Sequence, residues 1–160
     1  MDTAEHLVAI EDIKRVKARY FRCMDTKDWD GFADVFAPDA VMDMSEEAGK
    51  AAGDDSSVTR GAAAIAAMAR AGMEGVQTVH HGHMPEIEVL SPTTARGVWA
   101  MEDRLRWSTG PVRSLHGYGH YHDTYEKGDG GWRIKTTRLT RLRVDVEMNQ
   151  MVWSAALDPS

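Results

Sequence analysis

Cysteine is almost absent from this 160-residue chain, in which Cys23 is the only one. A single thiol excludes an intrachain disulfide and any zinc site built on several thiolates, so we expect Cys23 to be a small buried apolar residue. Long apolar runs are also missing, and none approaches the roughly 20 residues that span a bilayer. The first residues lack the basic and apolar segments of a signal peptide. We therefore expect a cytoplasmic protein with no membrane partner.

Basic charge is scarce as well, since 19 Lys and Arg face 25 Asp and Glu, for a net charge of −6. This acidic balance argues against binding to nucleic acid or to anionic lipid. The sequence contains no glycine-rich phosphate loop, no G-x-S-x-G elbow and no H-E-x-x-H pair. The length suits one domain, which we place at residues 1–148, followed by a C-terminal tail at residues 149–160.

The first half of the chain has the pattern of helices. From Thr3 to Met24 apolar residues recur every three or four positions, as on a helix that buries one stripe. Asp28 is a suitable N-cap for a short second helix that ends at Pro38. Three further elements are expected before Gly75: a strand at 40–44, a polar loop at 45–59 that is a candidate lid, and an alanine-rich helix at 62–71 closed by Gly72.

After Gly75 the pattern changes to four long β-type runs, separated by turn signals at 91–93, 108–111 and 128–131. With the strand at 40–44 counted as the first run, these are the second to the fifth. These connections are too short for crossover helices, so consecutive strands must pair antiparallel. With helices segregated at the start of the chain, the fold class is α+β. The N-terminal helices must cover one face of the sheet.

The third run places a carboxylate among apolar side chains. Strict alternation puts Trp99, Met101, Leu105 and Trp107 on one face, and Asp103 shares that face. A buried carboxylate must be paired, hydrogen-bonded or protonated, because an unpaired buried charge costs several kcal/mol. Two interpretations stay open: an ion pair with an arginine of a neighbouring strand, or an acid that orients a catalytic histidine.

Asp25 raises a similar question on the first helix. It lies on the flank of the apolar stripe near the C-terminal end, where the helix dipole disfavours negative charge. The plain interpretation is a solvated turn residue.

Histidines cluster in the second run at His80, His81 and His83. Alternation sends His81 and His83 to the face opposite His80, and two histidines on a strand supply only two metal ligands. We therefore expect no metal site, and interpret most of these histidines as a polar surface or a subunit contact. His80 lies five residues before Pro85, which should force a bulge or a sheet edge.

The fourth run has two different faces. Gly117, Gly119 and Tyr121 share one face, and the glycines leave room for another group, such as a ligand or a helix, to approach closely. The opposite face carries four half-polar rings: His116, Tyr118, His120 and His122. An exposed sheet face with aromatic side chains usually needs cover, so we expect a homo-oligomer, either a dimer or a trimer.

The order of elements, the Tyr20 and Asp25 pair, the string DWDGFADVFAPDA and the ending GYGHYHDTYEKGDGGWRIKTTRL together resemble the SnoaL-like group of the ketosteroid isomerase and nuclear transport factor superfamily. Within it the chain is most similar to the dehydratase branch, which includes scytalone dehydratase and bile-acid 7α-dehydratase. The resemblance covers about residues 4 to 145. It implies a cone-shaped curved antiparallel sheet of about four to six strands, wrapped over three helices around an apolar pocket.

The resemblance also implies roles for particular residues. The catalytic pair falls on Asp25 and His80, with His81 one register away, and the accompanying tyrosine falls on Tyr20. The second acid of the bile-acid enzyme falls on Asp103. The predicted substrate pocket consists of Trp99, Met101, Tyr121, Met44 and Trp107. One departure is that the dehydratases carry a tyrosine at the position of Met44.

We hypothesise a cofactor-independent dehydratase or isomerase for a cyclic, steroid-like or aromatic small molecule. His80, oriented by Asp25, would remove a proton next to a carbonyl, Tyr20 would bind the developing oxyanion, and a protonated Asp103 would assist the leaving group. No metal or organic cofactor is required. The main alternative is a non-catalytic ligand-binding or structural member of the same fold, and a third is a small β-subunit-like module of a larger oxygenase.

Overall fold

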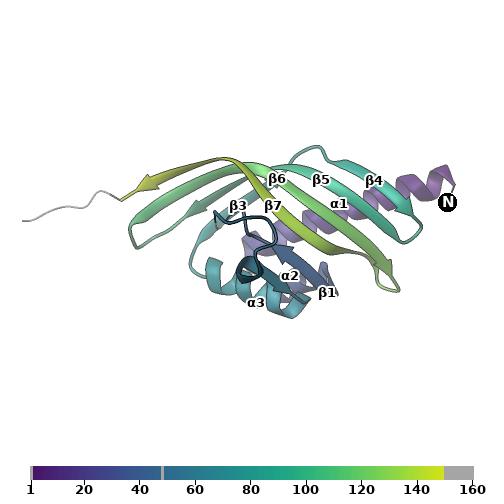
Figure 1. Cartoon of the computed structure of the whole chain (residues 1–160), viewed down its shortest axis with the longest axis horizontal. Helices are drawn as coiled ribbons and strands as arrows, with labels where there is room; N and C mark the ends of the chain where they lie inside the picture. The colour runs from purple at the N-terminus through teal and green to yellow at the C-terminus, as the bar shows by residue number, and fades with distance from the viewer. Residues whose placement is uncertain (1, 48, 150–160) are drawn as a thin grey trace, which may run out of the picture.

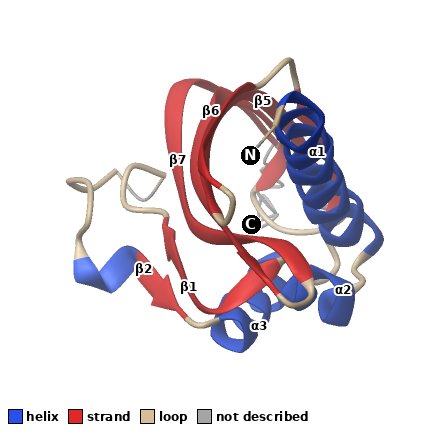
Figure 2. Cartoon of the chain, turned by 90° about the vertical axis from the view of Figure 1, so that its right-hand side faces the viewer, coloured by secondary structure: helices blue, strands red, loops and turns tan. Residues whose placement is uncertain are grey.

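The sheet and the helices form two layers in the computed structural model, which describes residues 2–47 and 49–149. One strongly curved sheet arches over the helices, and the long strands β5, β6 and β7 make most of the arch (Figures 1 and 2). The helices are α1 (Thr3–Thr26), α2 (Trp29–Asp34) and α3 (Ala62–Met73). The strands are β1 (Phe36–Asp43), β2 (Val58–Arg60), β3 (Gln77–Gly82), β4 (Glu86–Ser91), β5 (Thr94–Arg106), β6 (Val112–Gly128) and β7 (Gly131–Met148).

Helix α1 begins at a capping box, in which Asp2 accepts from the Glu5 backbone N–H and Glu5 accepts from that of Asp2. Its buried stripe includes Ile13, Val16 and Tyr20, so the predicted helix is confirmed. The helix continues two residues past the predicted end. Asp25 therefore lies inside the last turn and is not a residue of the following loop.

Two predicted boundaries in the helical half are wrong. Phe36 begins strand β1 and is not part of α2, because the chain becomes extended before Pro38, as the residues before a proline prefer. Pro38 lies where β1 loses its register with β7. Helix α3 runs through Gly72 to Met73 and ends in an extended residue, Glu74, so Gly72 does not close it. The predicted loop at 45–59 contains a single 3₁₀ turn, Asp55–Ser57, before β2.

The predicted α+β fold is confirmed, with seven strands where about four to six were expected. The strand order is β2-β1-β7-β6-β5-β3, and β4 also pairs with β5. The second β run is two strands because the chain breaks at Pro85, and both strands pair antiparallel with β5. Pairing of β1 with β7 is parallel, so the sheet is mixed. The rule that tight turns give antiparallel pairs applies only to consecutive strands, and β1 and β7 are far apart in sequence.

Strand alternation decides which side chains face the helices. Trp99, Met101, Asp103 and Leu105 are all buried on the concave face of β5, as predicted. Trp107 lies one residue beyond the end of this strand and is half-buried. No helix in the described part of the chain is long and apolar enough to cross a membrane. The predicted tail from residue 150 onward lies outside the described residues.

Candidate active site

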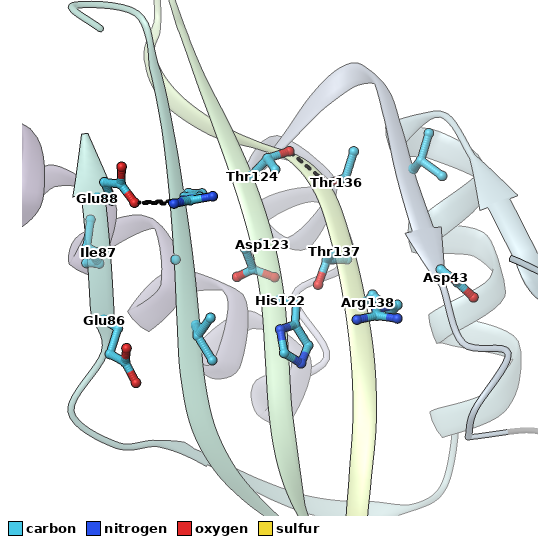
Figure 3. A pocket seen from close by; sticks show the side chains of 14 residues that line it. Asp43, Glu86, Ile87, Glu88, His122, Asp123, Thr124, Thr136, Thr137 and Arg138 are labelled. Atoms are coloured by element: carbon cyan, nitrogen blue, oxygen red, sulfur yellow. Dashed lines mark hydrogen bonds and ion pairs between the residues drawn. The ribbon is translucent and has the colours of Figure 1, made fainter. Parts of the chain in front are cut away.

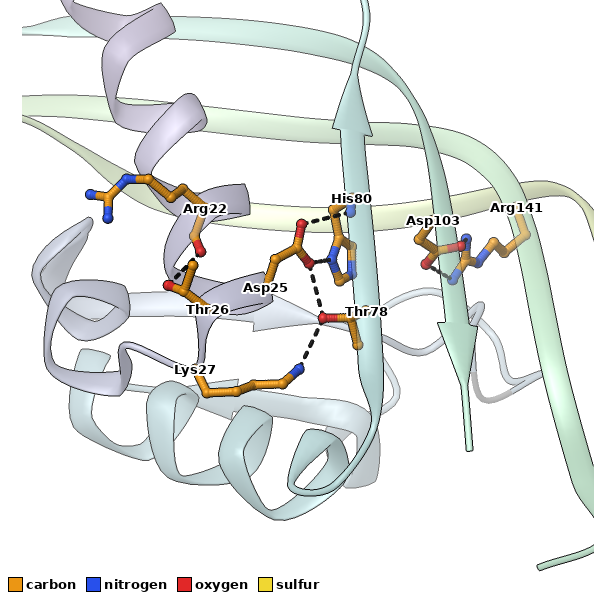
Figure 4. A network of polar contacts seen from close by, with 8 residues as sticks. All are labelled: Arg22, Asp25, Thr26, Lys27, Thr78, His80, Asp103 and Arg141. Atoms are coloured by element: carbon orange, nitrogen blue, oxygen red, sulfur yellow. Dashed lines mark hydrogen bonds and ion pairs between the residues drawn. The ribbon is translucent and has the colours of Figure 1, made fainter. Parts of the chain in front are cut away.

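The centre of the site is a hydrogen-bonded pair formed by Asp25 on α1 and His80 on β3 (Figure 4). His80 Nδ1 lies 2.6 Å from Asp25 Oδ1, and the His80 backbone N–H donates to Oδ2 at 2.9 Å. The Thr78 hydroxyl donates to Oδ1 at 2.9 Å. Asp25 is thus not the solvated turn residue that its position in the sequence suggested.

The contacts of Asp25 determine which nitrogen of His80 is free. An ionised carboxylate only accepts hydrogen bonds, so Nδ1 must carry the proton and Nε2 presents a lone pair. Partial burial pushes the pKa of Asp25 upward, but the bonds from His80 and Thr78 outweigh burial and leave that pKa below its ordinary value. Asp25 therefore stays ionised at neutral pH. The pair is an oriented imidazole whose Nε2 can accept a proton.

Asp103 lies directly opposite His80 in the pairing of β3 with β5. It forms a two-pronged ion pair with Arg141 of β7, with Nη1 to Oδ1 at 2.9 Å and Nη2 to Oδ2 at 2.8 Å (Figure 4). Of the two interpretations of Asp103, the structure shows the ion pair with an arginine, but Arg141 lies two strands away and not on a neighbouring strand. A carboxylate held by both oxygens in such a fork is ionised. The expected proton donor is therefore absent at Asp103.

The ion pair crosses strand β6 at a position without a side chain. A Cβ atom at Gly117 would lie 2.3 Å from Arg141 Nη1 and 2.3 Å from Asp103 Oδ1. At Gly119 it would lie 1.9 Å from the Thr140 carbonyl oxygen, where β6 and β7 change register. A ligand or a helix was expected to approach these glycines, whereas the structure places the Arg141 guanidinium and the Asp103 carboxylate at Gly117.

Arg141 is the site residue that the sequence reasoning missed. Its Nε–H also binds the carboxylate of Glu47, from the loop after β1, so three of its donors are engaged within the protein. Strand alternation in β7 could have identified it, because Arg141 is two residues from Leu139 and so shares the face on which Leu139 is buried. The guanidinium brings a fixed positive charge close to Asp103.

Two buried phenols, Tyr20 and Tyr121, lie close enough to Asp103 and Arg141 to feel their charges. Their rings meet edge to face with centroids 5.6 Å apart, and the Phe21 ring stacks on the His80 imidazole at 6.4 Å. Burial raises the pKa of both phenols, so each keeps its proton at neutral pH. The two side chains also share a hydrogen bond, which raises the pKa of Tyr121 and lowers that of Tyr20, as when Tyr121 donates to Tyr20. The Tyr20 hydroxyl keeps its own hydrogen, as the donor role predicted for it requires.

A second buried ion pair, between Lys17 and Asp123, lies against the rings of Tyr20 and Tyr121. Lys17 Nζ lies 2.8 Å from Asp123 Oδ2, and both side chains are fully buried. The ammonium also lies 3.7 Å from the centroid of the Tyr121 ring. Asp123 further accepts from Tyr125, which in turn accepts from Trp99. This network fixes the position of Lys17, whose ammonium group packs against the rings of Tyr20 and Tyr121.

The predicted pocket residues are not all brought together. Trp99, Met101 and Tyr121 belong to one buried apolar cluster, and Met44 packs against its edge. Trp107 lies outside that cluster. Neither His80 nor Asp25 lines the hollow formed by β1, β4, β5, β6 and β7 or the hollow formed by β3, β5 and β6. An enclosed pocket beside His80 stays a prediction.

The larger hollow, about 800 Å³, is a groove on the outer face of the sheet (Figure 3). Residues from five strands line it, among them Asp43, Glu88, His122 and Arg138. On the outer face Glu102 also forms hydrogen bonds with two histidines, His81 at 3.3 Å and His116 at 2.8 Å. Among residues 2–47 and 49–149, no three His, Cys, Asp or Glu side chains are grouped to hold a metal ion.

A protein-family model and a curated fungal protein both match most of this chain. A family model described as a SnoaL-like domain matches residues 5–138. The probable cyclase FGR4 of Gibberella zeae is 27% identical over 140 residues, which cover 81% of this chain and 89% of that protein.

Solved structures with the same fold include enzymes of elimination chemistry. A protein from Novosphingobium aromaticivorans assigned as a scytalone dehydratase superposes with a TM-score of 0.77 at 22% identity, covering 96% of this chain and 99% of its own. The LinA-type3 hexachlorocyclohexane dehydrochlorinase of Novosphingobium barchaimii superposes with a TM-score of 0.76 at 14% identity, covering 99% and 100%. At these identities the likeness shows the fold alone.

Proposed function

The chain belongs to the SnoaL-like domain family, and from this membership and the site geometry we propose that it is a lyase or isomerase for a small organic molecule. In finer terms, it is a cofactor-independent dehydratase or isomerase for a cyclic, steroid-like or aromatic substrate. The observation that carries this proposal is the 2.6 Å contact of Asp25 with His80 Nδ1, which leaves Nε2 as a base. A general base of this kind contributes about 10²–10⁴-fold to the rate.

In the proposed reaction, His80 Nε2 takes a proton from the carbon next to a carbonyl group. The electrons of that C–H bond form the enolate, whose oxygen accepts a hydrogen bond from Tyr20 and faces the positive charge of Arg141. In a dehydration the bond from the β-carbon to its oxygen then breaks, and the imidazolium returns the proton to the departing hydroxide. In an isomerisation the imidazolium gives the proton to another carbon instead.

Asp103 has a different role in this scheme from the one first expected. Because it is ionised and paired, it orients the Arg141 guanidinium and does not protonate the leaving group. Trp99, Met101 and Tyr121 are the apolar and aromatic surface against which a cyclic substrate would pack.

A second candidate, a non-catalytic binding or structural protein, is favoured by one observation. The His80 side chain is only 6% exposed, as in a residue retained for packing. In that case the Asp25–His80 pair would stabilise the packing of α1 on β3 without turnover.

We further propose that the protein is a homodimer whose subunits meet on the outer sheet face of His116, Tyr118, His120 and His122. All four side chains are half-buried in the single chain, and His122 also lines the groove on this face. Cytoplasmic location stays a prediction.

The functional proposal is tested by NMR in deuterated water over a panel of cyclic β-hydroxyketones and 3-ketosteroids. We expect α-proton exchange or elimination with wild-type protein, and its loss in His80→Ala and in Asp25→Asn. His81→Ala is the matched control, because His81 is the adjacent histidine on the outer face. If no panel member reacts while some raise the melting temperature, the binding protein is the correct alternative.

A further inference from the structure

Lys27 has an unusual backbone conformation at the end of α1. Its φ and ψ are 61° and 29°, in the left-handed region, and it is the only non-glycine residue with positive φ in the described part of the chain. Its N–H closes the helix by donating to the carbonyls of Cys23 and Met24. Glycine is the usual residue at such a position, because a side chain makes this conformation costly. A lysine here calls for a compensating role of its side chain.

The Lys27 side chain reaches back toward the active site. Its Nζ donates to Thr78 Oγ1 at 2.9 Å, and Nζ lies 5.9 Å from the centroid of the Trp29 ring. An ammonium group can only donate, so Thr78 must accept from Lys27 and turn its own hydrogen elsewhere. That hydrogen goes to Asp25 Oδ1, 2.9 Å away (Figure 4).

Thr78 and His80 share one face of β3, because they are two residues apart on the strand. Both donate to the same oxygen of Asp25, while the His80 backbone N–H occupies the other. The carboxylate therefore cannot rotate without losing a donor on each oxygen. The lysine occupies the acceptor side of the Thr78 hydroxyl, and the ionised carboxylate sets the direction of the two bonds from His80.

We propose that Lys27 and Thr78 are positioning residues that orient Asp25, and through it hold the proton of His80 on Nδ1. This inference rests on the proposed role of His80 as the base. The charged groups around His80 are Asp25 on α1, Lys27 at the end of α1, Asp103 on β5 and Arg141 behind Asp103. Of these, Lys27 alone acts on the hydroxyl that binds Asp25.

The test observes the pair directly and needs no substrate. In the ¹H NMR spectrum of the full chain, the hydrogen-bonded Nδ1 proton of His80 gives a separate downfield signal, identified by its loss in His80→Ala. In Lys27→Gly and in Thr78→Val we expect this signal to move upfield and its exchange with water to become about tenfold faster. Thr78→Ser, which keeps the hydroxyl, should restore the wild-type signal.

Stability separates positioning from folding. Glycine relieves the left-handed strain, so Lys27→Gly should melt at or above the wild-type temperature while its His80 signal is weakened. Thr26→Val is the control, because the Thr26 hydroxyl lies beside Asp25 but binds only the Arg22 carbonyl, at 2.8 Å. A wild-type His80 signal in folded Lys27→Gly and Thr78→Val proteins overturns the inference. A changed signal in a protein without turnover supports it and rejects the proposed enzyme instead.

Discussion

Replacing Gly117 by alanine tests whether the Asp103–Arg141 pair crosses β6 as described. The new Cβ would lie 2.3 Å from an atom of each partner, while real Cβ atoms essentially never approach closer than 3.0 Å. Both partners must therefore move, and they are nearly fully buried, with side-chain exposures of 5% and 12%. Loss of a buried pair typically costs 3–5 kcal/mol, whereas extra volume alone costs 1–3. We expect Gly117→Ala to lower the free energy of unfolding by about 3 kcal/mol.

Urea unfolding followed by tryptophan fluorescence measures this loss. With an m-value of about 2 kcal/mol per M, the midpoint should fall by about 1.5 M. Gly128→Ala, near the end of the same strand, is the matched control, because nothing lies within 4 Å of its Cβ position. It should leave stability unchanged or raise it slightly, since alanine is less flexible than glycine when unfolded. A Gly117→Ala protein within 0.5 kcal/mol of wild type would refute the crossing.

Three further predictions concern buried charge. Lys17→Met leaves Asp123 unpaired and should lower the free energy of urea unfolding by about 3–5 kcal/mol, part of which Lys17→Met combined with Asp123→Asn should recover. Wild-type protein should lose stability as the pH falls through the lowered pKa of Asp25, because a carboxyl group with a depressed pKa stabilises the fold only while it is ionised. In thermal melts, Asp25→Asn should flatten this decrease of the melting temperature at acid pH. Arg141→Lys, which cannot make the two-pronged contact with Asp103, should lower the melting temperature and, in protein that is still folded, lower the rate of α-proton exchange about tenfold or more.

Each of these has a clear contrary result. Equal stabilities of the Lys17→Met single variant and the wild type would show that Asp123 is satisfied without the lysine. A loss of stability at acid pH that is unchanged in Asp25→Asn would show that other carboxylates cause it. Full exchange activity in Arg141→Lys would show that the guanidinium does not stabilise the proposed oxyanion.

The sequence was most informative where one simple period governs the structure. Alternation placed Asp103 on the buried face of β5, and the helical period placed Tyr20 on the buried stripe of α1. The proline rule predicted a bulge or a sheet edge at Pro85, and the chain is interrupted there, between β3 and β4. In each case the property depends on a few neighbouring residues, so a single sequence contains it.

The long-range partners could not be predicted in the same way. Arg141 reaches Asp103 across a whole strand, and the register of β7 changes between the pairs of Tyr118 and Gly119, which upsets simple counting. Lys17 occupied a position of the apolar stripe, but only its pairing with Asp123 explains a fully buried lysine there. The Asp25–His80 pair joins residues 55 positions apart, and the family resemblance, not the local pattern, pointed to it.

The central claim is that the His80 imidazole is the base of the reaction, and chemical rescue tests it most directly. The measurement is the rate of α-deuterium incorporation by His80→Ala, with and without added imidazole, on a panel compound that wild-type protein exchanges. The account predicts a loss of about 10²–10⁴-fold that imidazole partly restores. A wild-type rate in His80→Ala without imidazole would contradict it.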